Sequence, residues 1–313
     1  MKKAKLLLLA CLAGLMCLML TGCGGGSAGG GDGKTIVFAS HDDVSHGFTQ
    51  AIYEAVKSRA ESKGYTVEMV NANMDASLQI DQMNEELAKK PAAVVLLPVD
   101  ATALVPAVQK ANDMKIPVLV TNRDIAGGTT AQVQSDEYQA GKLQGEFMAK
   151  HLKQGAKIVY FFGDTTLVSA NERWRGFKEA CLDKRPDIEL LASQDAKWNK
   201  SNALRYMTLW LKIFPEIDGV ACGNDDMALG AIAAMKAAGR FNGVYTTGVD
   251  AGDEAVKSVA AGELSQTIKQ DPDALADKIV EELEQMISGG QNENNDKVPF
   301  IEITRDNVAQ FMK

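Results

Sequence analysis

Short β-rich apolar runs alternate with amphipathic segments along most of this chain. Most of the apolar runs are continuous, which is typical of parallel strands that helices cover on both faces. Strand–helix alternation predicts right-handed βαβ units and doubly wound sheets, and about ten strands suit two sheets better than one. The predicted strands are 36–40, 66–71, 93–98, 118–122, 158–162, 189–193, 219–222, 245–249 and 265–268, with helices that include 48–63, 77–89, 101–115, 138–152, 202–214 and 226–238.

The first 22 residues have the features of a secretory signal peptide. Three lysines lie among the first five residues, and an uncharged apolar run follows at 6–20. A transmembrane anchor would need about 20 apolar residues. The segment Leu20-Thr21-Gly22-Cys23 resembles the lipobox of bacterial lipoproteins, which implies cleavage before Cys23 and a diacylglycerol on its sulfur. We therefore expect an exported protein, lipid-anchored at the outer face of the cell membrane or in the periplasm.

A glycine-rich stretch at 23–33 contains two patterns that resemble nucleotide-binding loops. Gly24, Gly26 and Gly29 have the G-x-G-x-x-G spacing, and the stretch ends in Gly33-Lys34-Thr35. Such loops must follow a strand and open a helix, whereas this stretch follows a signal peptide and precedes an apolar run. The P-loop pattern also needs glycine at position 28, which is alanine. We predict a flexible tether instead.

Removal of the signal peptide makes the chain more acidic. The mature chain carries 30 basic and 41 acidic side chains, a net charge of −11, which argues against nucleic acid as a partner. Besides Cys23, only Cys181 and Cys222 remain, and each lies in an apolar stretch. The two could pair, but buried free thiols are the favoured interpretation. The length allows two domains with a large core.

Ligands of open α/β sheets bind beyond the carboxyl ends of the strands. The residues that follow the predicted strands are rich in planar hydrogen-bonding groups, although Asp226 and Asp43 are at least as well explained as helix N-caps. Trp198 stands in a polar loop and is a ligand candidate, whereas the apolar spacing around Trp210 predicts a core residue. The strand-end residues are His41, Asp42, Asp43, Asn122, Arg123, Asp136, Asp164, Trp198, Asn224, Asp225, Asp226, Asp250 and Gln270.

Residues 34–313 resemble the ribose-type sugar-binding proteins that supply bacterial ATP-binding-cassette importers. The strongest matching stretches are CGNDDMALGAIAAMKAAG (222–239), TTGVDA (246–251) and SQTIKQDPDALA (265–276). Weaker ones are IPVLVTNRD (116–124), VQSDEYQAG (133–141) and SANERWRGF (169–177), and all six occur in the family's order. The resemblance implies a periplasmic binding protein type I fold, in which two similar α/β lobes are joined by three crossovers. It implies an N-terminal lobe of 34–135 plus 271–299 and a C-terminal lobe of 136–270 plus 300–313.

The resemblance also implies a ligand site in the cleft between the lobes. Phe48 and Trp198 fall where the family sandwiches a sugar ring, because the C–H faces of a sugar are apolar. Arg, Asp and Asn side chains would bind its hydroxyl rim. The implied ligand-binding residues are His41, Asp42, Ser45, Phe48, Asn122, Arg123, Arg173, Trp198, Asn224, Asp250 and Gln270.

The chain departs from the ribose pattern at several positions. Asn122 stands where ribose binders have an aspartate, Gly47 replaces an aromatic residue, and His41 with Asp42 is unlike the usual first loop. The lost carboxylate is expected to shift the pocket charge towards positive. The ligand could therefore be a pentose, a hexose, a cyclitol such as inositol, a polyol or a sugar acid. Arg123 and Arg173 could clamp a carboxylate, although the family uses these positions for hydroxyl groups.

The expected function is delivery of a captured sugar or polyol to a membrane permease with its ATPase, by a monomer without cofactor or metal. An enzyme is not expected, because the chain lacks H-E-x-x-H and G-x-S-x-G, although His46 and Asp42 could form an acid/base pair. A ligand-sensing module for a membrane kinase or chemoreceptor remains the alternative. The effector half of a repressor is excluded by the signal peptide and the missing helix-turn-helix segment.

Overall fold

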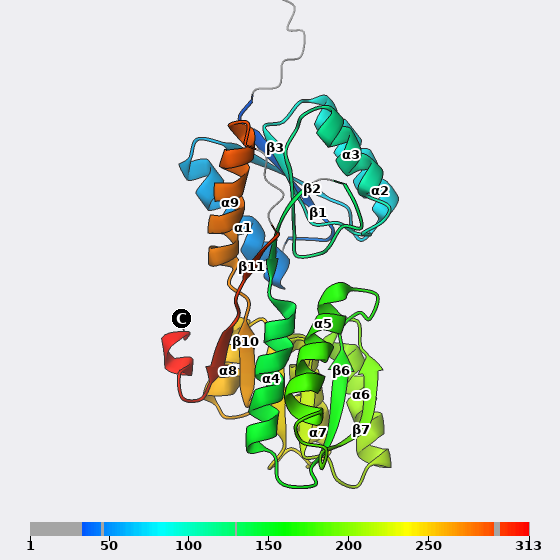
Figure 1. Cartoon of the computed structure of the whole chain (residues 1–313). Coiled ribbons are helices and arrows are strands. Elements are labelled where there is room, and N and C mark those ends of the chain that lie inside the picture. Colours follow the sequence, from blue (N-terminus) through cyan, green and yellow to red (C-terminus); the bar gives the residue numbers. More distant parts are fainter. Residues whose placement is uncertain (1–32, 45–46, 129, 291–294, 313) are drawn as a thin grey trace, which may run out of the picture.

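The computed structural model describes residues 33–44, 47–128, 130–290 and 295–312, which form two α/β lobes (Figure 1). Each lobe contains a six-stranded sheet. All strand pairs are parallel except β10 (Gln266–Lys269) with β12 (Ile301–Thr304). The predicted fold class, two doubly wound lobes, is confirmed.

The N-terminal lobe is built around the strand order β11-β5-β4-β3-β1-β2. Alternate residues of β1 enter different cores, which explains why its apolar run is continuous: Ile36 and Phe38 face one cluster, and Val37 and Ala39 face the other. Helices α1 (Gly47–Ser62) and α9 (Pro272–Ile287) cover the first face, and α2 (Ala76–Ala88) and α3 (Val105–Asp113) cover the second. The strands are β1 (Thr35–Ser40), β2 (Thr66–Asn71), β3 (Ala93–Leu96), β4 (Val118–Thr121), β5 (Ala131–Ser135) and β11 (Asn295–Val298).

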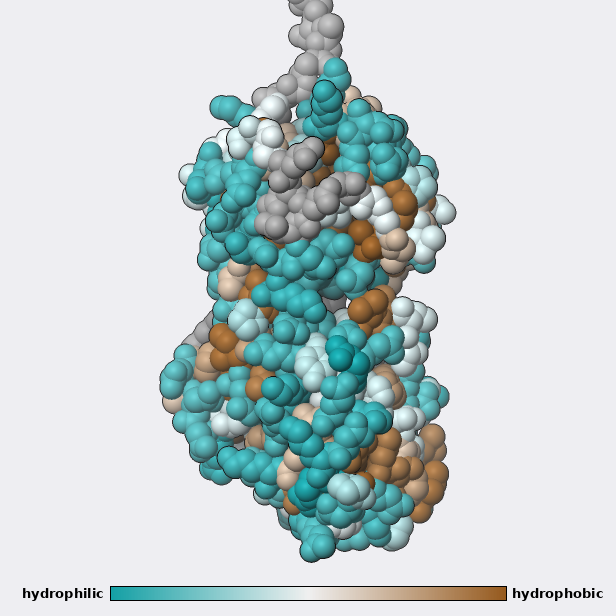
Figure 2. Space-filling view, viewed as in Figure 1, coloured by the Kyte–Doolittle hydropathy of each residue, from teal (hydrophilic) through white to brown (hydrophobic). Residues whose placement is uncertain are grey.

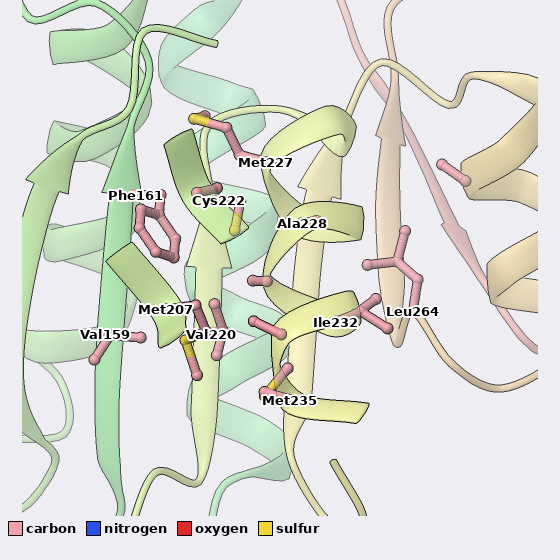
Figure 3. Close-up of a cluster of buried hydrophobic side chains, with 14 of the residues drawn as sticks. Val159, Phe161, Met207, Val220, Cys222, Met227, Ala228, Ile232, Met235 and Leu264 are labelled. Atoms are coloured by element: carbon pink, nitrogen blue, oxygen red, sulfur yellow. The ribbon is translucent and has the colours of Figure 1, made fainter. Parts of the chain in front are cut away.

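The C-terminal lobe repeats this plan with the order β12-β10-β9-β8-β6-β7. Val159 and Phe161 of β6 face the cluster shown in Figure 3, where α6 and α7 contribute Met207 and Met235. Ile158 and Tyr160 face the opposite cluster. The strands are β6 (Lys157–Phe162), β7 (Glu189–Asp195), β8 (Gly219–Cys222), β9 (Tyr245–Val249), β10 (Gln266–Lys269) and β12 (Ile301–Thr304); the helices are α4 (Glu137–His151), α5 (Val168–Phe177), α6 (Lys200–Ile213), α7 (Asp225–Ala237) and α8 (Asp253–Ala260).

The two lobes share one topology, which locates their functional edges. The strand order reverses between β1 and β3 in one sheet and between β6 and β8 in the other. Ligand crevices of doubly wound folds lie at such reversals, outside the carboxyl ends of the strands. The chain passes between the lobes three times, after β5, after β10 and after β11 (Figure 1).

All nine predicted strands are confirmed, but the sequence analysis missed β5, β11 and β12. The β5 segment alternates glutamine with small or apolar residues, and β11 is a polar edge strand. Helices α5, α8 and α9 were also not named. Trp210 is buried in the core, as predicted, and Cys181 and Cys222 are buried free thiols. Within the described residues, no helix is long and apolar enough to span a membrane.

Candidate functional site

A cavity of about 690 Å³ lies between the lobes, where the molecule narrows to a waist (Figure 2). Phe48, in the first turn of α1, lines it from the N-terminal lobe. Asp250 and Gln270, which follow β9 and β10, line it from the C-terminal lobe and the crossover. The first turn of α1 and the residues after β9 and β10 therefore meet at this waist, outside the carboxyl ends of the strands.

The guanidinium of Arg173 on α5 is held by hydrogen bonds and by two aromatic rings. Its Nε donates to Glu137 Oε2 at 2.5 Å, and Nη1 donates to the carbonyl oxygen of Gly223 at 2.5 Å. The guanidinium carbon lies 5.4 Å from the ring centroid of Trp198 and 5.7 Å from that of Phe300. Burial opposes its charge, but the carboxylates of Glu137 and Asp250 outweigh burial and raise the pKa of Arg173.

Trp198 is held beyond the end of β7 by two close glycines and a strained backbone. Both Lys197 and Trp198 have a left-handed conformation, with φ of 54° and 56°. A Cβ at Gly163 would lie 2.2 Å from three indole atoms, and one at Gly223 would lie 3.2 Å from the indole. The side-chain amide of Asn224 donates to the Trp198 carbonyl at 3.3 Å. Strain of this kind persists only where the surroundings enforce it, and it is often found at ligand sites.

Two carboxyl groups follow the ends of β8 and β9: Asp225 is buried, and Asp250 is half-buried beside Arg173. Asp225 accepts hydrogen bonds from the Thr267 hydroxyl at 2.7 Å and the Gly252 amide at 3.1 Å. Gln270 donates to Asp250 at 3.4 Å. Burial raises the pKa of Asp250 to about 7; Arg173 opposes this shift, whereas Glu137 and Asp226 add to it. Burial, and then the charge of Asp250, raise the pKa of Asp225 well above its ordinary value.

The N-terminal lobe contributes a neutral histidine and a second arginine. His41 is 6 % exposed, and its Nδ1 has no hydrogen-bond partner among the described residues. Burial, aided by the charge of Arg123, lowers the pKa of His41 to about 3. Burial also lowers the pKa of Arg123, while Asp164 of the other lobe and Asp42 oppose that shift. Arg123 therefore interacts with charges on both sides of the cleft.

The structure places most of the predicted site residues in two groups, and a few lie outside the described residues. Arg173, Trp198, Asn224, Asp250 and Gln270 form one connected group in the C-terminal lobe. His41, Asp42 and Arg123 form a second group in the N-terminal lobe, and Asn122 precedes Arg123 with a left-handed φ of 66°. Ser45, His46 and Cys23 lie outside the described residues.

The predicted capping role of Asp226 is wrong. Asn224 caps α7 by accepting a hydrogen bond from the Met227 amide at 3.0 Å, so Asp226 lies inside the first helical turn. The capping role of Asp43 stays a prediction, because residues 45 and 46, which precede α1, lie outside the described residues. A side-chain cap must directly precede the helix that it satisfies. Of the strand-end residues, Asp136 caps α4.

Glu137 is a site residue that sequence reasoning missed. It occurs in the quoted stretch 133–141, but neither its strand position nor the ribose pattern singled it out. Glu137 supplies a carboxylate that pairs with Arg173, so the charge of this arginine is compensated. The more positive pocket expected from Asn122 stays a prediction. Among the described residues, no group of three or more His, Cys, Asp or Glu side chains could hold a metal ion.

Comparisons with known proteins agree with this geometry. A family model described as periplasmic binding protein domain matches residues 36–291. The chain is 32 % identical over 311 residues to a xylitol-binding protein of Mycolicibacterium smegmatis, covering 95 % of this chain and 84 % of the relative. It is 28 % identical over 247 residues to the ribose import binding protein RbsB of Salmonella typhimurium, covering 79 % and 82 %.

Solved structures of solute-binding proteins have the same fold. A transporter solute-binding protein of Bacillus halodurans with bound myo-inositol superposes with a TM-score of 0.82 at 29 % identity, covering 90 % of this chain and 98 % of the other. A Caulobacter myo-inositol binding protein bound to myo-inositol also has a TM-score of 0.82, at 26 % identity, covering 91 % and 98 %. Several similar proteins thus bind small polyhydroxylated molecules.

Proposed function

Because this chain belongs to the periplasmic binding protein domain family, we propose that it captures a sugar or sugar-like polyol outside the cytoplasm and delivers it to an ATP-binding-cassette importer. Proteins of this family are exported, and this one is a binding protein, not an enzyme. Its partners are the ligand, a membrane permease and the ATPase of that permease. The ligand class comprises pentoses, hexoses and cyclitols such as inositol, since relatives are named for ribose, xylitol and myo-inositol.

The observation that carries the proposal is the arrangement around Arg173. Its guanidinium lies against the indole of Trp198, and Asp250 with Gln270 stands beside it at the cavity wall. An apolar ring face next to charged, planar hydrogen-bonding groups suits a sugar, which has apolar C–H faces and a rim of hydroxyls. In this proposal Phe48 and Trp198 contact the two faces of the ring, and His41, Asp42, Ser45, Asn122, Arg123, Asn224, Asp250 and Gln270 bind its rim with Arg173.

Transport requires that the importer distinguish loaded from empty protein. Ligand would first bind one lobe and then bridge to the other, with the three crossovers as the hinge. A ligand shifts such an equilibrium only through its higher affinity for the closed state. A change from mostly open to mostly closed takes about 5.5 kcal/mol, which several buried hydrogen bonds and ring contacts can supply.

The N-terminal residues complete the proposal. A lipid on Cys23 would hold the monomer at the membrane surface, and residues 23–33 would tether it there. Two or more acyl chains give stable anchoring, whereas one chain gives only marginal binding. The tether would let the cleft reach a permease in the same membrane.

A thermal-shift screen of residues 34–313 tests the proposal. Pentoses, hexoses, cyclitols, polyols and sugar acids are added singly, and melting is followed by fluorescence. A ligand at 100 times its Kd should stabilise the fold by about 2.7 kcal/mol. If no member of this set raises the melting temperature, the carbohydrate assignment fails.

Replacement of the stacking side chain gives a sharper test with the ligand so identified. Trp198→Ala should weaken binding by about 2 kcal/mol, or about 30-fold in Kd, because truncation of a buried aromatic anchor has costs of this size. Trp174→Ala is the matched control and should leave ligand affinity unchanged. Trp174 packs on Tyr160 and Phe162 in the core on the other face of the C-terminal sheet. Unchanged affinity in Trp198→Ala would contradict the stacking role.

A further inference from the structure

We infer that Glu137 is a specificity-determining residue that makes the cleft select uncharged sugars or polyols and reject sugar acids. The inference rests on the proposed function and narrows its ligand class. A carboxylate clamp of Arg123 and Arg173 was one interpretation of the sequence. The contacts of Arg173 argue against that clamp, and Glu137 is the residue responsible.

The hydrogen bonds of Arg173 occupy one nitrogen of each fork that could bind a carboxylate. A guanidinium binds a carboxylate bidentately either through Nε and Nη2 or through Nη1 and Nη2. Nε already donates to Glu137 and Nη1 to the Gly223 carbonyl, so each fork includes a nitrogen that is bonded to the protein. The rings of Trp198 and Phe300 lie over the guanidinium and hinder its rotation. The remaining N–H groups suit single hydrogen bonds, such as those that hydroxyl oxygens accept.

The charge of Arg173 is already balanced without the ligand. Arg173 is close to the carboxyl groups of Glu137 and Asp250, and its ion pair with Glu137 is buried, with side-chain exposures of 4 % and 18 %. A ligand carboxylate placed at Arg173 would therefore be desolvated beside Glu137 and Asp250, and the charge of that arginine is already compensated by them. Burial of a charge under such conditions is strongly unfavourable.

The fold fixes Glu137 in this position. Glu137 is the first residue of α4, and Asp136 before it caps the helix. Helices α4 and α5 approach so closely that a Cβ at Gly141 would lie 1.8 Å from the Arg173 carbonyl oxygen, and one at Gly176 would lie 2.1 Å from the Tyr138 carbonyl oxygen. Glycines at these two positions hold the first turn of α4 against the middle of α5. The pair Glu137–Arg173 is thus set by helix packing.

The test compares matched neutral and acidic ligands by isothermal titration calorimetry on the full-length chain in detergent. The pairs are xylitol with D-xylonate, D-ribose with D-ribonate, and D-glucose with D-glucuronate. For the pair that binds, we expect the wild type to prefer the neutral member by at least about 100-fold, the factor that two hydrogen bonds of about 1.4 kcal/mol each would supply. In Glu137→Gln, which frees Arg173 Nε from its carboxylate, this preference should fall by at least about tenfold.

Two further variants separate specificity from structure. Glu137→Asp keeps the charge and should retain most of the preference. Glu216→Gln removes the same charge at the far end of the lobe, where Glu216 pairs with Lys153 at 2.7 Å, and should leave the preference unchanged. Melting temperatures verify folding of each variant.

The outcomes distinguish the two hypotheses. If the neutral member binds and Glu137→Gln keeps the full preference, the role of Glu137 is disproved while the proposed function stands. A wild type that binds the acid as tightly as the neutral member also overturns the inference, whether or not the variant folds. If neither these titrations nor the thermal-shift screen finds a neutral ligand, the proposed function fails and the inference fails with it.

Discussion

At the scale of single residues, the cleft tolerates backbone strain that glycine would relieve. Asn122, Trp198 and Asp250 have φ values of 66°, 56° and 117°. Such conformations cost about 1–3 kcal/mol each and persist only where the surroundings impose them. All three follow a strand and carry side chains proposed to contact ligand. The strain is consistent with side chains kept for binding, since stability alone would favour glycine at these positions.

The raised pKa of Asp250 predicts a pH dependence of stability. Its pKa is about 7 in the fold against an ordinary 3.8, so between pH 4 and pH 7 the folded chain holds a proton that the unfolded chain has released. The free energy of unfolding contributed by this group therefore falls as pH rises through that window. Asp250→Asn should remove at least about 1.4 kcal/mol of this fall, the equivalent of one pKa unit. Urea unfolding of ligand-free wild type and variant at pH 5 and pH 8 measures this change in the free energy of unfolding.

The neighbours of Asp250 define the control for this experiment. Arg173, Glu137 and Asp226 act on Asp250 electrostatically and remain in the variant, as does Asp225, whose pKa is shifted in the same direction. A smaller pH dependence should therefore persist. Asp183→Asn removes an exposed carboxylate that pairs with Lys178 at 2.6 Å and should leave the wild-type dependence intact. Equal slopes in Asp250→Asn and wild type would contradict the prediction.

At the scale of elements, the N-terminus of α7 joins a structural role to a proposed binding role. Asn224 accepts a hydrogen bond from the Met227 amide as the N-cap and donates to the Trp198 carbonyl. One residue therefore fixes the start of α7 and the loop that carries the indole. Helix starts at the carboxyl ends of strands often serve both purposes, because their free N–H groups point into the crevice.

Removal of this cap should affect stability and binding together. We expect Asn224→Ala to lower the free energy of unfolding by about 1 kcal/mol, the usual effect of losing a cap. It should also weaken ligand binding by about tenfold, because Trp198 loses its anchor and the ligand loses a hydrogen bond. Urea unfolding and calorimetry measure the two effects.

The matched control is a cap on another helix. Asp75 caps α2 by accepting hydrogen bonds from the amides of Ser77 and Leu78. Asp75→Ala should cause a similar loss of stability with unchanged ligand affinity. A binding loss of the same size in both variants would mean that Asn224 acts on the ligand only through stability.

At the scale of the whole molecule, charges across the cleft bias the relative positions of the lobes. Arg123 follows β4 in one lobe and interacts with Asp164, which follows β6 in the other. This attraction favours closer lobes even without ligand. The attraction acts on the same equilibrium between open and closed lobes that the ligand is proposed to shift. Any contact that is present only in the closed state raises the population of that state.

Removal of this attraction should open the ligand-free protein. Asp164→Asn is expected to increase the radius of gyration in small-angle X-ray scattering. It should weaken apparent ligand affinity by about 0.5–1 kcal/mol, or about two- to fivefold, as for a solvent-accessible ion pair. Asp183→Asn, which alters a surface ion pair of the same lobe, should change neither quantity. A radius of gyration and an affinity equal to those of the wild type would exclude a role for Asp164 in closure.

The sequence by itself determined the alternation of elements and the polar residues at strand ends. A buried strand needs apolar residues on both faces, and this requirement leaves a local signature, as in β1 and β6. The candidate ligand-binding residues were found from their positions after the predicted strands, because ligands of doubly wound sheets bind at the carboxyl ends of strands. The predictions for Cys23 and Ser45 stay predictions, because both lie outside the described residues.

Only the tertiary structure decided which of these residues act together. Polar edge strands such as β11 are stabilised by a neighbouring strand and carry no apolar pattern of their own. Glu137 meets Arg173 because glycines bring α4 and α5 into close contact, and Gly163 matters only because the indole of Trp198 fills the place of a Cβ. The pKa of Asp250 likewise depends on burial and on charges from distant segments. Local pattern encodes burial, whereas contacts between residues far apart in the chain arise only when the helices and sheets pack.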